Sequence, residues 1–141
     1  MALVKDVMSK KVVSIDADAP VLDAARLMKE KKIGSLIVYT QQSPAGIITE
    51  RDFVYRVLCE EKDVRTTTVG SVMSKPLISV DPFAPLEEVA EIMKNSNVRT
   101  VGVISKGQLE GVMTARDLMN AEAKDIKSLS KYVNAFFRQR G

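Results

Sequence analysis

The chain has 141 residues, a formal net charge of +3 at pH 7 and a sequence pI near 9.0. This mildly basic balance suits an anionic small ligand and does not by itself indicate nucleic acid, because the basic residues are scattered among acids. A single cysteine excludes an intrachain disulfide, and the lack of histidine excludes the usual zinc sites and histidine-based catalysis. No apolar run approaches ~18 residues, and none precedes the first charges, so we expect a cytoplasmic protein without a membrane span or signal peptide.

Two parts of the chain repeat one another. When residues 7–52 are set over 72–117 with a constant shift of sixty-five, sixteen of forty-six positions are identical without a gap. A match of this length indicates an internal duplication. We expect the first repeat at 1–62, the second repeat at 63–121 and a C-terminal helix at 122–141.

Each repeat begins with a short β-branched strand, at 12–15 and at 77–80. A proline then suits the first turn of a helix, Pro20 in one copy and Pro85 in the other. The helix has an apolar face with helical spacing, which predicts a core face rather than a cofactor site. That face comprises Val21, Ala24, Ala25, Leu27 and Met28 in the first copy, and Leu86, Val89, Ala90, Ile92 and Met93 in the second.

A hairpin follows the helix in each copy. Buried strands at 35–39 and 100–104 lead through turn residues into strands at 45–49 and 109–113. We place the turns at Ser43-Pro44 in the first copy and at Ser105-Lys106-Gly107 in the second.

A second helix begins near Glu50 and near Ala115, so each repeat reads β-α-β-β-α. The predicted fold class is α/β (α+β), with two such repeats packed sheet to sheet about a pseudo-twofold axis. The helix after Glu50 runs to about Glu61 and includes Cys59, which we expect to be a small buried hydrophobe rather than a reactive thiol.

An apolar stripe with helical spacing lies beyond the second repeat, at Ile126, Leu129, Val133 and Phe136. It predicts a C-terminal helix that packs on its own unit, or one that contacts a second subunit or a partner protein. The sequence leaves both alternatives open.

The second strand of each hairpin ends in a recurring motif, Gly-φ-φ-Thr-x-Arg-Asp, where φ is apolar. In a structural interpretation, the threonine caps a helix, the aspartate three residues on completes a capping box, and the glycine serves a tight strand entry. In a ligand-binding interpretation, the helix N-terminus favours an anion, the arginine suits phosphate, and the carboxylate accepts from two vicinal ribose hydroxyls. The recurring arginine favours the second interpretation, because capping needs no arginine.

The doubled motif, on two copies of strand–helix–strand–strand–helix, resembles a tandem pair of CBS domains (cystathionine β-synthase domains), often called a Bateman module. The resemblance covers roughly residues 4–60 and 69–121. It implies a regulatory, energy-sensing module that binds an adenosyl compound: AMP, ADP, ATP or S-adenosylmethionine. It implies no catalysis, no metal and no further cofactor.

The resemblance also implies two sites that each draw on both repeats. One site would join Ile47, Thr49, Arg51 and Asp52 to Leu77, Ile78, Val98, Arg99 and Thr100. The other would join Val112, Thr114, Arg116 and Asp117 to Val12, Val13, Ile33, Gly34 and Ser35. The aspartates would bind ribose hydroxyls, the threonines and arginines phosphate, and the apolar strand residues adenine.

The two implied sites differ at one position, where Arg99 in the second copy corresponds to Gly34 in the first. The family often carries a basic residue there that reaches phosphate. We therefore expect the Asp52 site to bind more phosphate charge, and we favour it as the first site to be occupied. A solvated charge is the alternative interpretation of Arg99.

Three functions compete at this point. The favoured one is a stand-alone nucleotide sensor, since the chain has no nucleophile–base set and no Gly-rich phosphate loop of the usual kinds. The second is an interaction or assembly module with vestigial ligand sites, and the third, least favoured, is direct nucleic-acid binding. A homodimer is expected from the apolar outer helices, with an unknown regulated protein as a further partner.

Overall fold

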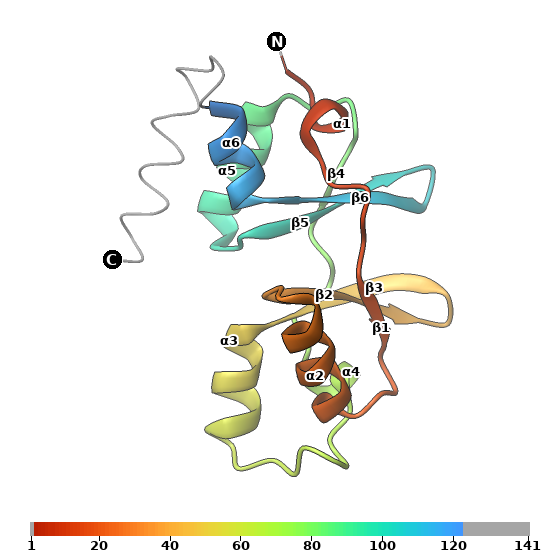
Figure 1. Ribbon diagram of the computed structural model, residues 1–141. Coiled ribbons are helices and arrows are strands. Elements are labelled where there is room, and N and C mark those ends of the chain that lie inside the picture. Colours follow the sequence, from red (N-terminus) through yellow and green to blue (C-terminus); the bar gives the residue numbers. More distant parts are fainter. Residues whose placement is uncertain (1, 123–141) are drawn as a thin grey trace. The chain divides into compact units, whose positions relative to one another are not determined.

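The computed structural model describes residues 2–122, so the stripe at Ile126, Leu129, Val133 and Phe136 and the helix predicted for 122–141 lie outside the described residues, apart from position 122 itself. The described chain forms two compact units (Figure 1). The first unit comprises residues 12–78, and the second unit comprises residues 2–11 together with 79–122.

The first unit is a three-stranded sheet with helices. In chain order its elements are β1 (Ser14–Asp16), α2 (Val21–Lys31), β2 (Ser35–Thr40), β3 (Ser43–Thr49), α3 (Glu50–Asp52), the π-helix η1 (Phe53–Leu58) and α4 (Val69–Val72). The strand order is β1-β2-β3, with β1 parallel to β2 and β2 antiparallel to β3. The parallel pair is joined through α2, which is the usual connection between parallel strands.

The second unit repeats this plan. Its elements are α1 (Val4–Val7), β4 (Ser79–Val80), α5 (Leu86–Ser96), β5 (Thr100–Ser105), β6 (Gln108–Thr114) and α6 (Ala115–Glu122). The strand order β4-β5-β6 has the same parallel and antiparallel pairs. Two three-stranded sheets with helices confirm the predicted α/β class and the β-α-β-β-α order of each repeat.

The helix that follows the first strand contributes to the core of each unit, and in the first unit that core also includes buried residues of the sheet, η1 and α4. The predicted apolar faces are buried at Val21, Ala24 and Met28 on α2, and at Leu86, Val89, Ala90 and Met93 on α5. The other predicted members, Ala25, Leu27 and Ile92, are half-buried. The helical spacing therefore identified the core faces correctly, with their edges at the half-buried positions.

The segment that leads into each repeat packs in the unit of the other repeat. In the second unit, the Val4 N–H of α1 donates to the Ala84 carbonyl at 2.9 Å. In the first unit, the Val69 N–H of α4 donates to the Ala19 carbonyl at 2.8 Å. Each compact unit therefore contains most of one repeat together with the leading segment of the other repeat. The boundaries of the units differ from those of the repeats in the sequence.

The predicted turn of the first hairpin was wrong. The turn residues are Gln41 and Gln42, with φ of 50° and 68°, and Ser43 and Pro44 already belong to β3. Two successive residues with positive φ are typical of the tight turn that matches the twist of a two-stranded hairpin. Serine and proline signalled a turn but do not occupy it. In the second hairpin Lys106-Gly107 is confirmed as the turn, with φ of 52° and 78°, whereas the predicted turn residue Ser105 is the last residue of β5.

Cys59 is exposed, so its predicted burial was wrong. It lies at the C-terminal cap of η1, where the helix has already left the core, and Val57 is the last buried residue before it. The helix also ends at Leu58, earlier than the predicted Glu61. The short first strands begin two residues later than predicted, at Ser14 and Ser79.

Candidate functional site

Both copies of the motif form a capping box where a hairpin strand runs into a helix (Figure 1). In the first unit the Thr49 N–H donates to Asp52 Oδ2 at 2.9 Å, and the Asp52 N–H donates to Thr49 Oγ1 at 3.4 Å. In the second unit the equivalent distances between Thr114 and Asp117 are 2.8 and 3.2 Å. The capping box of the structural interpretation is confirmed, and the carboxylates are fixed at the starts of α3 and α6. The glycines lie within β3 and β6 rather than at a strand entry.

The motif glycines are required by the close approach of another backbone segment. A Cβ on Gly46 would lie 2.5 Å from the Ser74 carbonyl oxygen, and one on Gly111 would lie 2.6 Å from the Ser9 carbonyl oxygen. These approaches arise because the residues after α4 and α1 add short antiparallel bridges, Ile47 with Ser74 and Val112 with Ser9. No larger residue fits there without moving that backbone.

The motif arginines have no part in the capping boxes. Arg51 and Arg116 are exposed, and neither side chain makes a hydrogen bond or ion pair with any residue of 2–121. Each guanidinium is therefore available to an anionic ligand near a helix start. This is the feature of the motif that the structural interpretation does not explain.

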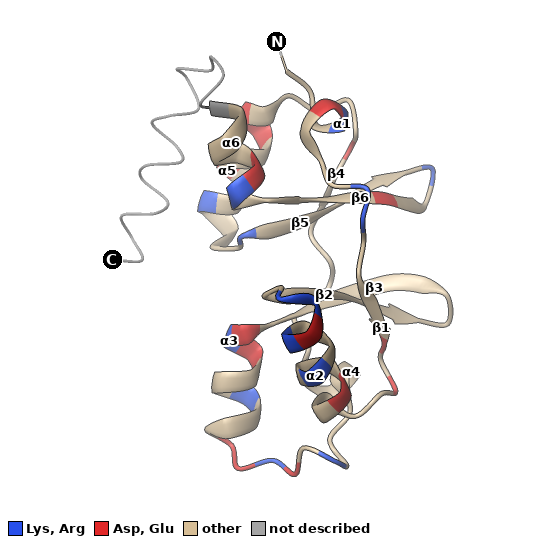
Figure 2. Cartoon of the chain, viewed as in Figure 1, with Lys and Arg blue, Asp and Glu red and all other residues tan. Residues whose placement is uncertain are grey.

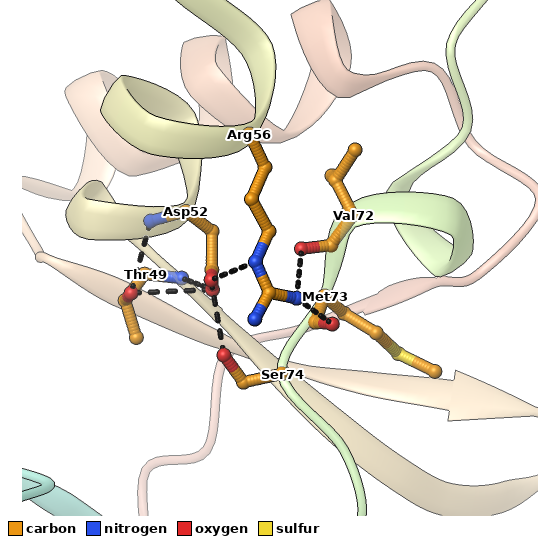
Figure 3. A network of polar contacts seen from close by, with 6 residues as sticks. All are labelled: Thr49, Asp52, Arg56, Val72, Met73 and Ser74. Atoms are coloured by element: carbon orange, nitrogen blue, oxygen red, sulfur yellow. Dashed lines mark hydrogen bonds and ion pairs between the residues drawn. The ribbon is translucent and has the colours of Figure 1, made fainter. Parts of the chain in front are cut away.

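The carboxylate of Asp52 is the centre of a polar network in the first unit (Figure 3). Asp52 is only 4% exposed, and it is the one charged residue counted in the buried core of the described chain. Its Oδ2 accepts from the Thr49 hydroxyl at 3.2 Å as well as from the Thr49 N–H, and its Oδ1 accepts from the Ser74 hydroxyl at 3.0 Å. The carboxylate is thus hydrogen-bonded through both oxygens, as a buried charge requires.

Arg56 joins this network to the end of α4. Its Nε lies 3.7 Å from Asp52 Oδ1, and the arginine side chain is 53% exposed, so this ion pair is weak. Its terminal nitrogen donates to the Met73 carbonyl at 2.9 Å and to the Val72 carbonyl at 3.3 Å. Arg56 and Ser74 together tie the Asp52 carboxylate to residues 72–74 (Figure 3).

The second unit lacks this network. The repeat shift pairs Ser74 with Ser9, whose oxygen instead accepts from the Lys11 N–H at 3.3 Å. It pairs Arg56 with Ala121, which has no side-chain donor. Asp117 is half-buried, and its only hydrogen bonds within residues 2–122 are those to Thr114. The two carboxylates therefore have the same cap and different surroundings.

The position at which Gly34 corresponds to Arg99 lies beside the start of the motif helix in each unit. The Glu50 N–H donates to the Gly34 carbonyl at 3.2 Å, and the Ala115 N–H donates to the Arg99 carbonyl at 2.8 Å. A Cβ on Gly34 would lie 2.7 Å from Glu50 Oε1. The first unit thus has a glutamate where the second unit has alanine, and glycine where the second has arginine.

The predicted site residues are divided between the two units. The first unit holds Val12, Val13, Ile33, Gly34, Ser35, Ile47, Thr49, Arg51, Asp52, Leu77 and Ile78. The second unit holds Val98, Arg99, Thr100, Val112, Thr114, Arg116 and Asp117. Strand pairing brings Ser35 beside Thr49, and Thr100 beside Thr114. The predicted combination of each motif with strands of the other repeat stays a prediction.

Sequence reasoning missed Ser74 and Arg56. Arg56 lies four residues after Asp52, and this spacing is typical of an ion pair along a helix, so it could have been found. Ser74 has an identical counterpart in Ser9, and the only local signal is two residues on, where Pro76 lacks the N–H that Lys11 donates to Ser9.

The charges of the described chain are mixed rather than gathered on one face. Figure 2 shows lysine and arginine interspersed with aspartate and glutamate in both units. Within residues 2–122 there is no group of three or more acidic, cysteine or histidine side chains that could hold a metal ion. The helices in this range are also too short and polar to span a bilayer.

Comparison with known proteins gives consistent matches. Residues 4–58 and 69–124 each match the CBS domain family. The CBS domain-containing protein YhcV of Bacillus subtilis is 30% identical over 118 residues, which cover 84% of this chain and 84% of YhcV. The solved hexameric CBS-CP12 protein from bloom-forming cyanobacteria is 35% identical, with a TM-score of 0.80 over 89% of this chain and 76% of that one. The CBS domain pair of protein MJ0100, solved in complex with 5′-methylthioadenosine and S-adenosyl-L-methionine, is 24% identical, with a TM-score of 0.79 over 88% of this chain and 98% of that one.

Proposed function

This chain belongs to the CBS-domain family and carries a tandem pair of CBS domains, a regulatory module, and we propose that it senses an adenosyl compound such as AMP. ADP, ATP and S-adenosylmethionine are the other candidate ligands. In this proposal the module has no catalysis of its own, and ligand binding changes a surface that is read by a partner protein.

The exposed motif arginines carry this proposal. Arg51 and Arg116 recur beside a capped carboxylate, and neither side chain makes a hydrogen bond or ion pair among residues 2–121. A planar guanidinium matches the oxygens of a phosphate, and a carboxylate accepts from the two hydroxyls of a ribose. A nucleoside phosphate supplies both groups at a fixed separation. The fold itself is one that holds an adenosyl compound in protein MJ0100.

We propose ligand contacts for the predicted residues in the same terms. The phosphate contacts would come from Thr49, Arg51, Thr114 and Arg116, and the ribose contacts from Asp52 and Asp117. The apolar residues Val12, Val13, Ile33, Ile47, Leu77, Ile78, Val98 and Val112 would surround adenine. Gly34, Ser35, Arg99 and Thr100 complete the proposed set beside the motif helices.

Calorimetric titration of the full chain with AMP, ADP, ATP and S-adenosylmethionine tests the proposal. The mass of the protein in solution is measured on the same sample, so that the number of sites per subunit is defined. A ligand at about 100 times its dissociation constant should also stabilise the fold by about 2.7 kcal/mol. No heat of binding and no thermal shift with any of the four compounds would remove the sensor function.

An assembly module with vestigial sites is the second candidate, and the exposed side chains of η1 favour it. Tyr55 and Leu58 are 62% and 68% exposed, and Val54 beside them is 45% exposed. Exposed apolar groups that lie together are typical of a protein contact. We propose that this face supports self-association as a homodimer. Self-association alone is also compatible with the sensor function, because a dimeric module can still bind a ligand at the starts of α3 and α6.

A further inference from the structure

The two motif aspartates differ in how much of their capacity to accept hydrogen bonds is already used. A carboxylate offers about four lone-pair positions. Asp52 accepts from the Thr49 N–H, the Thr49 hydroxyl and the Ser74 hydroxyl, and Arg56 faces its Oδ1 at 3.7 Å. Asp117 accepts from the Thr114 N–H alone among residues 2–122. A ribose diol needs two acceptor positions, which Asp117 has and Asp52 lacks.

Burial strengthens this difference. Asp52 is 4% exposed, whereas Asp117 is half-buried. A ligand hydroxyl can reach Asp52 only if Ser74 or Arg56 gives way, and Arg56 is itself held by the Met73 carbonyl at 2.9 Å. Binding at the Asp52 end therefore breaks hydrogen bonds of this network. Binding at the Asp117 end breaks no hydrogen bond from a serine or arginine of residues 2–121.

The charge at the helix starts points the same way. In the first unit the Glu50 carboxylate fills the space that a side chain on residue 34 would need, with Oε1 2.7 Å from an ideal Cβ on Gly34. In the second unit the corresponding residues are Ala115 and Arg99. An anionic ligand is repelled by the extra glutamate at the start of the first unit's motif helix, and the second unit has no acidic residue at that position.

We propose that the Asp117 end binds the adenosyl ligand first, and that Ser74 and Arg56 are positioning residues that hold the Asp52 carboxylate in contact with its own chain. The Asp52 end then becomes available only when these contacts are displaced. This inference rests on the proposed function. It reverses the order favoured from the sequence, where Arg99 was the reason to place the first ligand at Asp52.

The test begins with AMP titrations of the full chain as wild type, Asp52→Asn and Asp117→Asn. We expect Asp117→Asn to weaken AMP binding by about tenfold or more, the usual worth of a hydrogen bond to a charged group. Asp52→Asn should change it by less than about threefold, since its carboxylate is not used. With 2′-deoxy-AMP as the ligand, the wild type should lose more affinity than Asp117→Asn, because asparagine has already replaced one accepting carboxylate oxygen with an amide group that only donates.

The positioning role is tested in the Asp117→Asn background, where only the Asp52 end is intact. Adding Ser74→Ala should tighten AMP binding about threefold or more, because one competing donor is removed. Ser74→Thr, which keeps the hydroxyl, should restore the weaker binding, and Ser9→Ala is the matched control that should change nothing. If Ser74→Ala lowers the folded fraction, Arg56→Gln gives the same comparison at a half-exposed side chain.

The outcomes separate the inference from the function on which it rests. AMP binding that is lost more in Asp52→Asn than in Asp117→Asn, or equally in both, overturns the inference and leaves the sensor function intact. Unchanged affinity in Ser74→Ala and Arg56→Gln overturns the positioning role. A wild type that binds neither AMP nor any other adenosyl compound overturns the proposed function and the inference together.

Discussion

The hydroxyl of Ser74 donates a hydrogen bond to Oδ1 of Asp52 at 3.0 Å, across twenty-two residues of sequence. The corresponding pair in the other repeat is Ser9 and Asp117, and Ser9 contacts Lys11 instead. Two identical serine–aspartate pairs therefore have different roles. In the first unit the pair ties the segment after α4 to the start of α3, which makes Ser74 part of the support of a buried charge.

Replacing Ser74 should destabilise the protein more than replacing Ser9. Hydrogen bonds to charged groups contribute roughly 1.5–3 kcal/mol, and Asp52 Oδ1 keeps only the weak Arg56 pair when the hydroxyl is gone. We expect Ser74→Ala to lower the free energy of unfolding by about 1–2 kcal/mol in urea denaturation. Ser9→Ala, whose hydroxyl contacts exposed backbone, should cost less than about 0.5 kcal/mol. Equal losses would show that the Asp52 contact adds nothing.

Alanine at Gly46 should be among the more costly small substitutions. Its Cβ would lie 2.5 Å from the Ser74 carbonyl oxygen and 2.9 Å from the Met73 sulfur, and the first of these is backbone that cannot turn away. Overpacking of this kind costs roughly 1–3 kcal/mol. Urea or thermal denaturation of Gly46→Ala measures the loss.

The matched control for Gly46→Ala is Gly107→Asn. Gly107 has a positive φ of 78° and nothing within 4 Å of an ideal Cβ. Asparagine tolerates that conformation better than most residues, so the cost should be less than about 1 kcal/mol. A Gly46→Ala variant as stable as Gly107→Asn would mean that the bridge between Ile47 and Ser74 is looser than its geometry indicates.

The capping boxes were predictable because they are local. Threonine and an aspartate three residues on are enough to specify the contact, and the structure has it at Thr49 and at Thr114. The order of elements in each repeat was also predictable, because the two copies align without a gap. A strand or helix indicated in one copy is therefore expected at the corresponding position of the other. Helix faces followed from spacing alone, as Val21 and Leu86 show.

The remaining features depend on contacts that no local pattern encodes. Ser74 differs locally from Ser9 only two residues on, where Pro76 has no N–H in the place of the Lys11 N–H that Ser9 accepts from. That the Ser74 hydroxyl instead meets Asp52, twenty-two residues away and beside Arg56, depends on the fold. The packing of α1 in the second unit and of α4 in the first likewise depends on contacts between segments that are far apart in the sequence. Gln41 adopts a positive φ because the hairpin twist requires it, and not because glutamine favours it.

Removing Arg116 should weaken phosphate binding without changing the fold, if the proposed function holds. The side chain is exposed and makes no hydrogen bond or ion pair within residues 2–121, so its loss should alter the free energy of unfolding by less than about 0.5 kcal/mol. We expect Arg116→Ala to weaken AMP binding about tenfold and to leave adenosine binding unchanged, because only AMP carries the phosphate.

Calorimetric titration with both ligands measures the effect of Arg116→Ala. Arg26→Ala, which removes an exposed arginine on α2 outside the motif, is the control for a general effect of charge. The same loss for AMP in both variants would reduce the role of Arg116 to nonspecific attraction. Equal losses for AMP and adenosine would place its contact away from the phosphate.

A charge on the apolar face of η1 should weaken self-association. Leu58 is 68% exposed beside Tyr55 at 62%, and a partner that covers them would have to bury the new charge unpaired. We expect Leu58→Glu to shift the mass measured by light scattering towards the monomer. Phe83→Ser is the control: Phe83 is 63% exposed but has the Lys5 ammonium 4.6 Å from its ring centroid, outside the η1 face. An unchanged mass for Leu58→Glu, or dissociation by Phe83→Ser alone, would show that the subunits meet elsewhere.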